Sequence, residues 1–159
     1  MTLRNAKKNQ ELQLITRQAQ LFMNIFESYR GIEFRRIAHQ VMVFDWKDFD
    51  DWTERYNERT NPEAIAAFSS VILFYGGIGV LVRRSLVDIG LVYELMSTSI
   101  KGFWCRYEPI IKGDREFFKN PKMWGDIENL YKMIIEIDEN PESIQIMRNY
   151  FQQLSQTNS

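Results

Sequence analysis

The stretch that decides the fold is SLVDIGLVYELMSTSIKGFWCRYEP, which covers residues 85–109. Its apolar side chains recur every three or four positions, and this spacing places them on one face of an α-helix. The pattern at Ser85 and Asp88 resembles a capping box, and Pro109 predicts the end of the helix. The residues on the apolar face are Ile89, Val92, Tyr93, Met96, Ile100, Phe103, Trp104 and Tyr107.

Helical spacing continues on the N-terminal side of this stretch. Apolar residues predict a first helix over residues 4–29 and, after a break at Gly31, a second over residues 33–44. Asp45 is placed to cap a third helix that ends near Tyr56. In the first helix, the residues predicted to share one face are Leu12, Ile15, Ala19, Phe22, Phe26 and Tyr29.

The tripeptide Asn-Pro-Glu occurs at residues 61–63 and again at residues 140–142. Each copy offers an asparagine to cap a helix, a proline for its first position and an acid for its first turn. The two copies therefore predict two helix starts. A further helix is predicted over residues 124–137, and the charged segment KGDREFFKNPK over residues 112–122 is interpreted as a loop.

Residues 64–82 carry no charge, and three interpretations compete for them. The stretch is long enough to cross a membrane, and Arg83 and Arg84 follow it like a positive-inside flank. Gly77 and Gly79 imitate part of a dinucleotide-binding turn, but the third glycine of that motif is missing. A helix that is apolar on all sides also suits the centre of a bundle, which we favour because the neighbouring amphipathic helices need a shared core.

The predicted fold is therefore all-α, a single compact bundle of six to seven helices with a central apolar helix around residues 62–83. One domain is predicted over residues 1–159, because this length suits one hydrophobic core and no linker divides the chain. We expect the basic N-terminal end over residues 1–11 to project from the core. We expect the polar tail over residues 155–159 to fray.

Composition excludes several kinds of site. The chain has one cysteine, one histidine and a net charge of −1 at pH 7. Cys105 alone cannot form an intramolecular disulfide or a multi-thiolate metal site, and His39 alone cannot form a site built on two histidines. We expect no metal, no cofactor, no catalytic residues and no nucleic-acid partner. The sequence leaves open whether His39 and Cys105 lie near each other.

Two segments are candidates for contact with a protein partner. The first is acidic, and the second contains Phe117 and Phe118, which would anchor a partner if exposed and would otherwise fold back onto the core. The acidic segment fits the solvated face of a helix. It also resembles the magnesium–diphosphate motif of all-α prenyl synthases, but the chain is too short for their helical barrel. Its acids are Asp45, Asp48, Asp51 and Glu54.

The N-terminal end of the chain is basic. The basic residues there are Arg4, Lys7, Lys8 and Arg17, and Glu11 is the only acid among them. Three interpretations are open: an ordinary solvated helix end, a nucleic-acid contact, or the flank of a membrane anchor. The low net charge of the chain argues against the nucleic-acid contact.

Six segments stand in a distinctive order along the chain: TLRN at residues 2–5, TRQAQLFM at 16–23, DWKDFDD at 45–51, NPEA at 61–64, GIGVLV at 77–82 and FWCRYEPII at 103–111. Over roughly residues 2–135 this order resembles a family of small archaeal and bacterial proteins grouped as a domain of unknown function. The resemblance implies a transmembrane helix just before Thr2, a cytosolic helical domain, and Arg4, Lys7 and Lys8 as the cytoplasmic flank of the anchor. It implies no activity.

These observations favour a non-enzymatic interaction or sensing domain of a single-pass membrane protein, located at the cytoplasmic face of the membrane. Its protein partner is unknown, and a cytoplasmic protein without an anchor is the alternative location. One alternative function is a small-molecule or lipid-binding helical bundle, which requires a cavity between helices. Another is an enzyme, which requires the acidic cluster to converge on a buried cleft.

Overall fold

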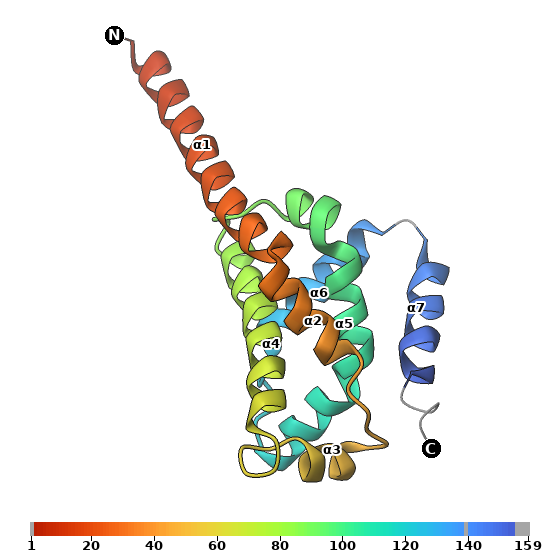
Figure 1. The fold of residues 1–159 in the computed structure, drawn as a ribbon. Coiled ribbons are helices and arrows are strands. Elements are labelled where there is room, and N and C mark those ends of the chain that lie inside the picture. The colour runs from red at the N-terminus through yellow and green to blue at the C-terminus, as the bar shows by residue number, and fades with distance from the viewer. Residues whose placement is uncertain (1, 139, 155–159) are drawn as a thin grey trace.

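The computed structural model describes residues 2–138 and 140–154, which form seven α-helices and no β-strand (Figure 1). The predicted all-α bundle is therefore confirmed. The polar tail predicted at residues 155–159 lies outside the described residues. The helices are α1 (Leu3–Arg30), α2 (Ile32–Met42), α3 (Phe49–Arg55), α4 (Pro62–Arg83), α5 (Ile89–Phe117), α6 (Gly125–Ile137) and α7 (Pro141–Gln153).

Helix α5 contributes more buried residues than any other helix, and it packs against α3, α6 and α7. The predicted apolar face is the buried face: six of its eight members are buried, while Ile89 and Tyr93 are half-buried. The capping-box interpretation is wrong in one respect. Asp88 caps α5 by accepting a hydrogen bond from the Gly90 N–H at 3.3 Å, whereas Ser85 has a φ of 57° in the turn that follows α4.

Pro109 does not end α5, which continues to Phe117, so the predicted loop over residues 112–122 is wrong in its first half. A proline inside a helix costs about 3 kcal/mol. Ile110 and Ile111, directly after it, are fully buried, and burying two such side chains stabilises the helix by about as much or more. Figure 1 shows α5 changing direction in its C-terminal half, as a helix does where a proline interrupts its hydrogen bonds.

Helix α4 begins as predicted, with the Asn61 side chain accepting a hydrogen bond from the Ala64 N–H at 3.1 Å. It packs against α2 and α6, and a Cβ atom at Gly79 would collide with the carbonyl of Asp126 in α6. Glycine therefore permits the close approach of α4 and α6. Within the described residues, α4 is the one helix long and apolar enough to cross a membrane, a test that core helices of soluble proteins also pass. Its buried residues lie on one side, and Ala66, Ser70, Leu73 and Gly77 on the other are exposed.

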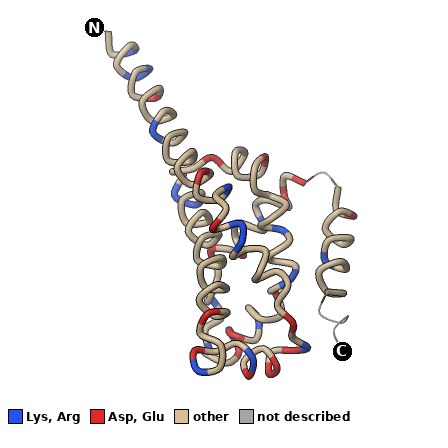
Figure 2. The backbone as a smooth tube through the Cα atoms, in the orientation of Figure 1, with Lys and Arg blue, Asp and Glu red and all other residues tan. Residues whose placement is uncertain are grey.

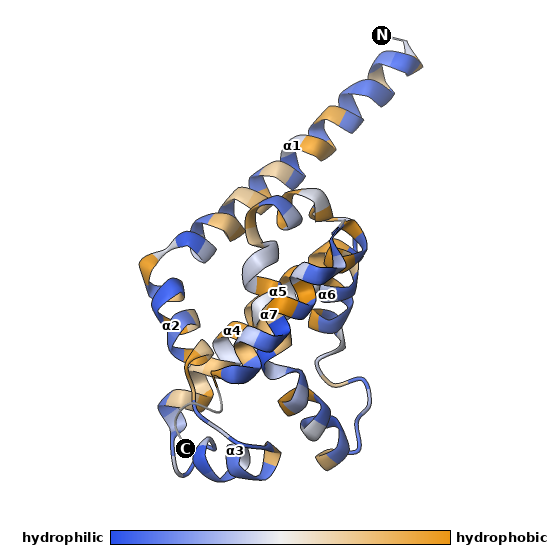
Figure 3. Ribbon diagram, turned by 90° about the vertical axis from the view of Figure 1, so that its right-hand side faces the viewer, coloured by the Kyte–Doolittle hydropathy of each residue, from blue (hydrophilic) through white to orange (hydrophobic). Residues whose placement is uncertain are grey.

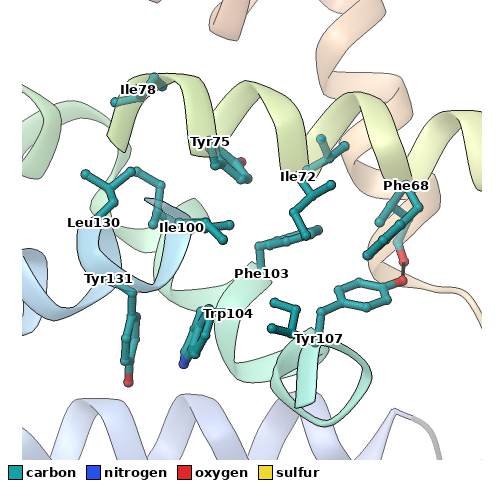
Figure 4. Close-up of a cluster of buried hydrophobic side chains, with 14 of the residues drawn as sticks. Phe68, Ile72, Tyr75, Ile78, Ile100, Phe103, Trp104, Tyr107, Leu130 and Tyr131 are labelled. Carbon is teal, nitrogen blue, oxygen red and sulfur yellow. Dashed lines mark hydrogen bonds between the residues drawn. The ribbon is translucent and has the colours of Figure 1, made fainter. Parts of the chain in front are cut away.

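Aromatic rings fill the space between α4 and α5 (Figure 4). The Phe68 ring of α4 lies 5.0 Å from the Tyr107 ring of α5, and Tyr107 lies 4.9 Å from Phe103. On the opposite side of α5, Trp104 stacks on Tyr131 of α6 at 5.4 Å. Because Phe68, Phe103 and Tyr107 contact one another and all of these rings belong to one buried cluster, α4, α5 and α6 share one continuous core.

Helix α1 is divided between the core and solvent. Phe22 and Tyr29 in its C-terminal half are buried, whereas Leu12 and Ile15 are 54% and 60% exposed. The prediction that all of these residues share a buried face is therefore wrong for the N-terminal half. Figure 1 gives the reason, since that half extends beyond the other helices, and Figure 3 shows that most of its residues are hydrophilic.

Two boundaries differ near the third helix. Helix α2 ends at Met42 rather than Phe44, and α3 begins at Phe49 with Asp48 as its cap. The Asp48 carboxylate accepts a hydrogen bond from the Asp51 N–H at 2.9 Å, so Asp45 does not cap this helix as predicted. Buried Phe44 and Trp46 hold the intervening segment extended against the core, which leaves only seven residues for α3.

Candidate functional site

A cavity of about 340 Å³ lies where α2, α4, α5 and α7 meet beside the end of α1. Most of the side chains around it are apolar, and among the described residues that line it none is acidic. A site of this size and character is typical of small-molecule pockets in helical proteins. The apolar part of its lining comprises Phe34, Ala38, Met42, Val43, Val71, Gly102, Phe103, Phe151 and Leu154.

Three hydroxyl groups converge at one side of the cavity. The Tyr29 and Ser99 oxygens are 2.6 Å apart, and the Tyr75 hydroxyl lies close enough to the same serine for Ser99 to influence its pKa. Burial raises the pKa of Tyr75 strongly, the Tyr29 phenol raises it further, and Ser99 opposes both only weakly. Tyr75 is therefore neutral at physiological pH, and the cluster offers hydroxyl donors and acceptors rather than charge.

Two basic side chains of α2 stand at the mouth of the cavity. Arg35 and His39 are one helical turn apart and exposed, and the Arg35 guanidinium lies 5.8 Å from the centre of the Tyr29 ring. A cation over an aromatic face is held loosely at an exposed position, because solvent screens the attraction. The mouth therefore combines mobile positive charge with an apolar interior.

Helix α7 forms one wall of the cavity, and it has no buried residue. Phe151 packs over Gly102 of α5, where a Cβ atom would come within 2.9 Å of the phenylalanine ring. The Phe151 carbonyl accepts a hydrogen bond from Arg106 at 3.3 Å. In Figure 1, α7 stands at the edge of the bundle with α5 beside it. This wall is consequently the least embedded part of the site.

The four acids of the predicted acidic segment do not converge on a buried cleft. Asp51 accepts hydrogen bonds from the Lys47 N–H at 2.9 Å and from Arg55 at 2.8 Å, and these two donors lower its pKa. Asp45 pairs with the same arginine at 3.3 Å, Asp48 caps α3, and Glu54 is exposed. Figure 2 shows this acidic end of the molecule around α3. Four acids that serve local structure or face solvent offer no buried catalytic centre.

The predicted aromatic pair is exposed, with Phe117 at 70% and Phe118 at 59%. The rings pack edge to face on each other at 5.0 Å, and Phe117 lies 6.5 Å from Phe49 of α3. The alternative in which both rings fold back onto the core does not hold. Their contact with a partner stays a prediction.

His39 and Cys105 belong to different surroundings. His39 is exposed at the cavity mouth, whereas Cys105 is buried, interacts with Arg148 and Tyr131, and does not line the cavity. Burial raises the pKa of the Cys105 thiol even though Arg148 lowers it, which leaves the thiol unreactive. Among the described residues, no group of three or more potential ligands is placed to hold a metal ion.

The basic residues predicted to flank a membrane, Arg4, Lys7 and Lys8, are exposed on the projecting end of α1 (Figure 2). They lie far along the helix from the cavity, which α1 meets at Tyr29. The structure therefore separates the membrane-flank candidates from the cavity.

Sequence reasoning missed the residues that build the cavity. It raised the possibility of a cavity between helices, but the glycines that it singled out, Gly77 and Gly79, do not line the cavity. The glycine that matters is Gly102, which lies in the middle of α5. A glycine interrupting the strongest amphipathic helix was the one available indication, because glycine weakens a helix unless close packing requires it.

A family model described as Domain of unknown function (DUF4760) matches residues 2–134. This match covers the cavity walls supplied by α1, α2, α4 and α5 and ends before α7. No curated protein and no solved structure matches the chain.

Proposed function

The chain belongs to the DUF4760 family, a domain of unknown function, and we propose that it is a sensing domain that binds a small amphiphilic molecule in the cavity beneath α7. The observation that carries this proposal is the cavity itself, with its apolar lining and its converging hydroxyl groups. At about 30 Å³ for each water-sized atom, 340 Å³ holds roughly eleven non-hydrogen atoms.

The lining selects a molecule with an apolar body and one polar group. Phe34, Val71 and Phe103 would surround the apolar body. The polar group would bond either to the hydroxyl cluster at Ser99 or to Arg35 at the mouth. A long-chain alcohol and a fatty acid of the same length test these two possibilities, because they share the apolar chain and differ in the head group, a neutral hydroxyl in one and an anionic carboxylate in the other.

Helix α7 is the element that would report binding. A ligand in the cavity would add apolar contacts to Phe151 and Leu154. Without a ligand, α7 packs mainly against one face of α5. A ligand that binds the closed arrangement better than the open one shifts the equilibrium toward closure. A protein partner would then distinguish the two positions of α7.

We further propose that the native chain is anchored in a membrane by a segment preceding Thr2, with the domain on the cytoplasmic side. Support comes from the basic residues of α1 and from the length of that helix, since 28 residues span about 42 Å. Such a helix would hold the cavity away from the lipid surface. A coding sequence with about 20 consecutive apolar residues before Thr2 would support the anchor, and a polar segment there would contradict it.

The cavity is tested by filling it. Ala38→Phe would place a ring inside it, whereas Ala66→Phe adds the same ring on the exposed side of α4. Decanol or decanoate at ten times its Kd should stabilise the wild-type protein by about 1.4 kcal/mol, which corresponds to a rise in Tm of about 4 °C. We expect Ala66→Phe to keep this shift and Ala38→Phe to lose it.

Calorimetric titration of the same three proteins gives the affinity directly, and hydrogen exchange locates the effect. Amides of α7 should gain protection on binding, while those of α4 change little. Equal binding by Ala38→Phe and Ala66→Phe, or no binding of either probe by the folded wild-type protein, would refute the proposed function.

A further inference from the structure

A second site is indicated by the guanidinium of Arg106, which is 2% exposed. Its two terminal nitrogens donate to main-chain carbonyls, one to Phe44 and one to Phe151. Its Nε–H has no acceptor among the described residues. The guanidinium lies 4.8 Å from the ring centre of Trp46, which is itself buried. A buried cation is therefore bonded only to neutral groups.

The indole N–H of Trp46 is also buried without an acceptor in the described part of the chain. The Tyr107 hydroxyl lies near the indole and donates its own proton to the Val41 carbonyl, but it forms no hydrogen bond with the indole N–H. Buried polar groups are nearly always hydrogen-bonded. Two unpaired donors on two residues that stack on each other consequently point to one missing partner.

Both residues line a groove of about 530 Å³ between the segment before α3 and the C-terminal half of α5. Lys47 and Lys112 stand at its rim, and Phe49 and Pro109 supply apolar walls. It also contains two acids. Asp48 is occupied by the Asp51 N–H, and Glu116 is exposed.

At the rim of the groove Lys112 is paired with Glu108 at 3.1 Å, whereas Arg106 inside it has no ion-pair partner among the described residues. Nearby Asp45 is held by Arg55 at 3.3 Å. Removing a cation from water without an anionic partner costs several kcal/mol. The missing partner is thus a hydrogen-bond acceptor that carries negative charge.

We propose that this groove binds a carboxylate attached to an apolar group, with the carboxylate on Arg106 and the Trp46 indole N–H and the apolar group against Phe49 and Pro109. Lys47 and Lys112 attract the anion at the rim. A charge-assisted bond to a carboxylate would satisfy both unpaired donors at once. The site is separate from the cavity beneath α7, so it stands or falls independently of the proposed function.

The indole N–H of Trp46 is the reporter for the test. Benzoate is titrated into ¹⁵N-labelled protein at constant ionic strength, with Trp46→Phe used to assign the resonance. We expect the Trp46 signal to shift downfield and saturate. The Trp124 indole, which already donates to Asp114 at 3.0 Å, should not move. Benzoate in the other cavity is excluded by repeating the titration on Ala38→Phe.

The matched variants are Lys112→Gln and Lys132→Gln. Each lysine pairs with a glutamate four residues earlier, at 3.1 Å for Lys112 and 3.2 Å for Lys132, but only Lys112 borders the groove. We expect Lys112→Gln to weaken benzoate binding about fivefold, the effect of one exposed charge near an anion, and Lys132→Gln to leave it unchanged. Arg106→Met, where it folds, should abolish the saturable shift.

Three results would overturn the proposal. One is a Trp46 shift that grows linearly with benzoate, without saturation. Another is equal affinity in Lys112→Gln and Lys132→Gln, which would remove the groove from the binding event. The last is phosphate saturating the Trp46 shift at lower concentration than benzoate, which would replace the carboxylate with a different anion class. None of these outcomes depends on whether Arg106→Met folds.

Discussion

Helices α6 and α7 have the same length, 13 residues each, and both are amphipathic helices that pack against α5. Yet α6 buries Ile127, Leu130, Tyr131 and Ile134, and α7 buries no residue. Their sequences alone do not explain this difference, because α7 has its own apolar face in Ile144, Met147 and Phe151.

The difference comes from what lies on the second side of each helix. Helix α6 sits between α4 and α5, where Gly79 lets its backbone approach closely. Helix α7 has α5 on one side and the cavity on the other. An apolar face that covers a cavity loses the dispersion contacts that a packed neighbour would supply. The two helices therefore differ in packing rather than in helical propensity.

The weaker packing of α7 affects its dynamics. An element with little buried apolar surface opens at lower free-energy cost than the core around it. Helix α7 is expected to open locally while α6 unfolds only with the whole protein. A lid that opens on its own is what the proposed sensing function requires, because ligand must enter and a partner must detect the change.

The largest effect should come from truncating the apolar face of each helix. Leu130→Ala removes a fully buried side chain of α6 and should lower the free energy of unfolding by about 4 kcal/mol. Ile144→Ala removes a half-buried side chain of α7 and should cost at most about 1 kcal/mol. Urea denaturation followed by circular dichroism measures both. Equal losses would mean that α7 belongs to the cooperative core.

The next effect concerns the junction between the two helices. Lys101 of α5 pairs with Asp138 at 2.5 Å, and both side chains are nearly buried. Breaking such a pair leaves a buried charge unpartnered, so Asp138→Asn should cost about 3 kcal/mol. Asp126→Asn, which breaks an exposed pair with Arg83, should cost less than about 1 kcal/mol. A similar loss in both variants would show that burial of the first pair is unimportant.

The same pair predicts a dependence on pH. Burial by itself would raise the pKa of Asp138, but the Lys101 ammonium and the Tyr93 hydroxyl outweigh it and hold the pKa below its ordinary value of 3.8. A carboxyl with a lowered folded-state pKa stabilises the protein above its unfolded value and loses this contribution as pH falls through the folded value. Acid titration from pH 5 downward should therefore destabilise the wild-type protein more than Asp138→Asn.

Local patterns predicted the helices well because their causes are local. The face from Ile89 to Tyr107 and the caps at Asn61 and Asn140 depend on residues within one or two turns, and the structure contains all of them. The helix end predicted at Pro109 was wrong. The energetic cost of a proline inside a helix is local, but the burial of Ile110 and Ile111 that offsets this cost depends on the whole fold.

The candidate site was less predictable for the same reason. Tyr29 and Ser99 are 70 residues apart in the chain, and their hydroxyl groups meet only after α1 and α5 have packed. The spacing of apolar residues in the sequence does not indicate which face of α7 covers the cavity. The acids and the phenylalanine pair, which the sequence singled out, lie away from the cavity. Residue types in the sequence identified exposed acidic and aromatic side chains, whereas the cavity depends on contacts between residues that are far apart in the chain.

The smallest and most specific effect comes from the duplicated Asn-Pro-Glu starts. The Asn61 side chain accepts from the Ala64 N–H at 3.1 Å at the start of α4, and Asn140 accepts from the Glu142 N–H at 3.0 Å at the start of α7. Replacing either asparagine with alanine should cost about 1 kcal/mol. The chemistry is the same, so any difference between the two variants reflects the helix that each cap supports.

Asn61→Ala should lower the urea midpoint of the whole protein, because α4 unfolds only with the core. Asn140→Ala should leave that midpoint nearly unchanged and instead speed hydrogen exchange of α7 amides about fivefold, the factor that 1 kcal/mol gives for local opening. If Asn140→Ala lowers the midpoint as much as Asn61→Ala, α7 is not an independent lid. Helices α6 and α7 would then differ in how exposed they are but not in how readily they open. In that case α7 could not report ligand binding in the cavity as proposed.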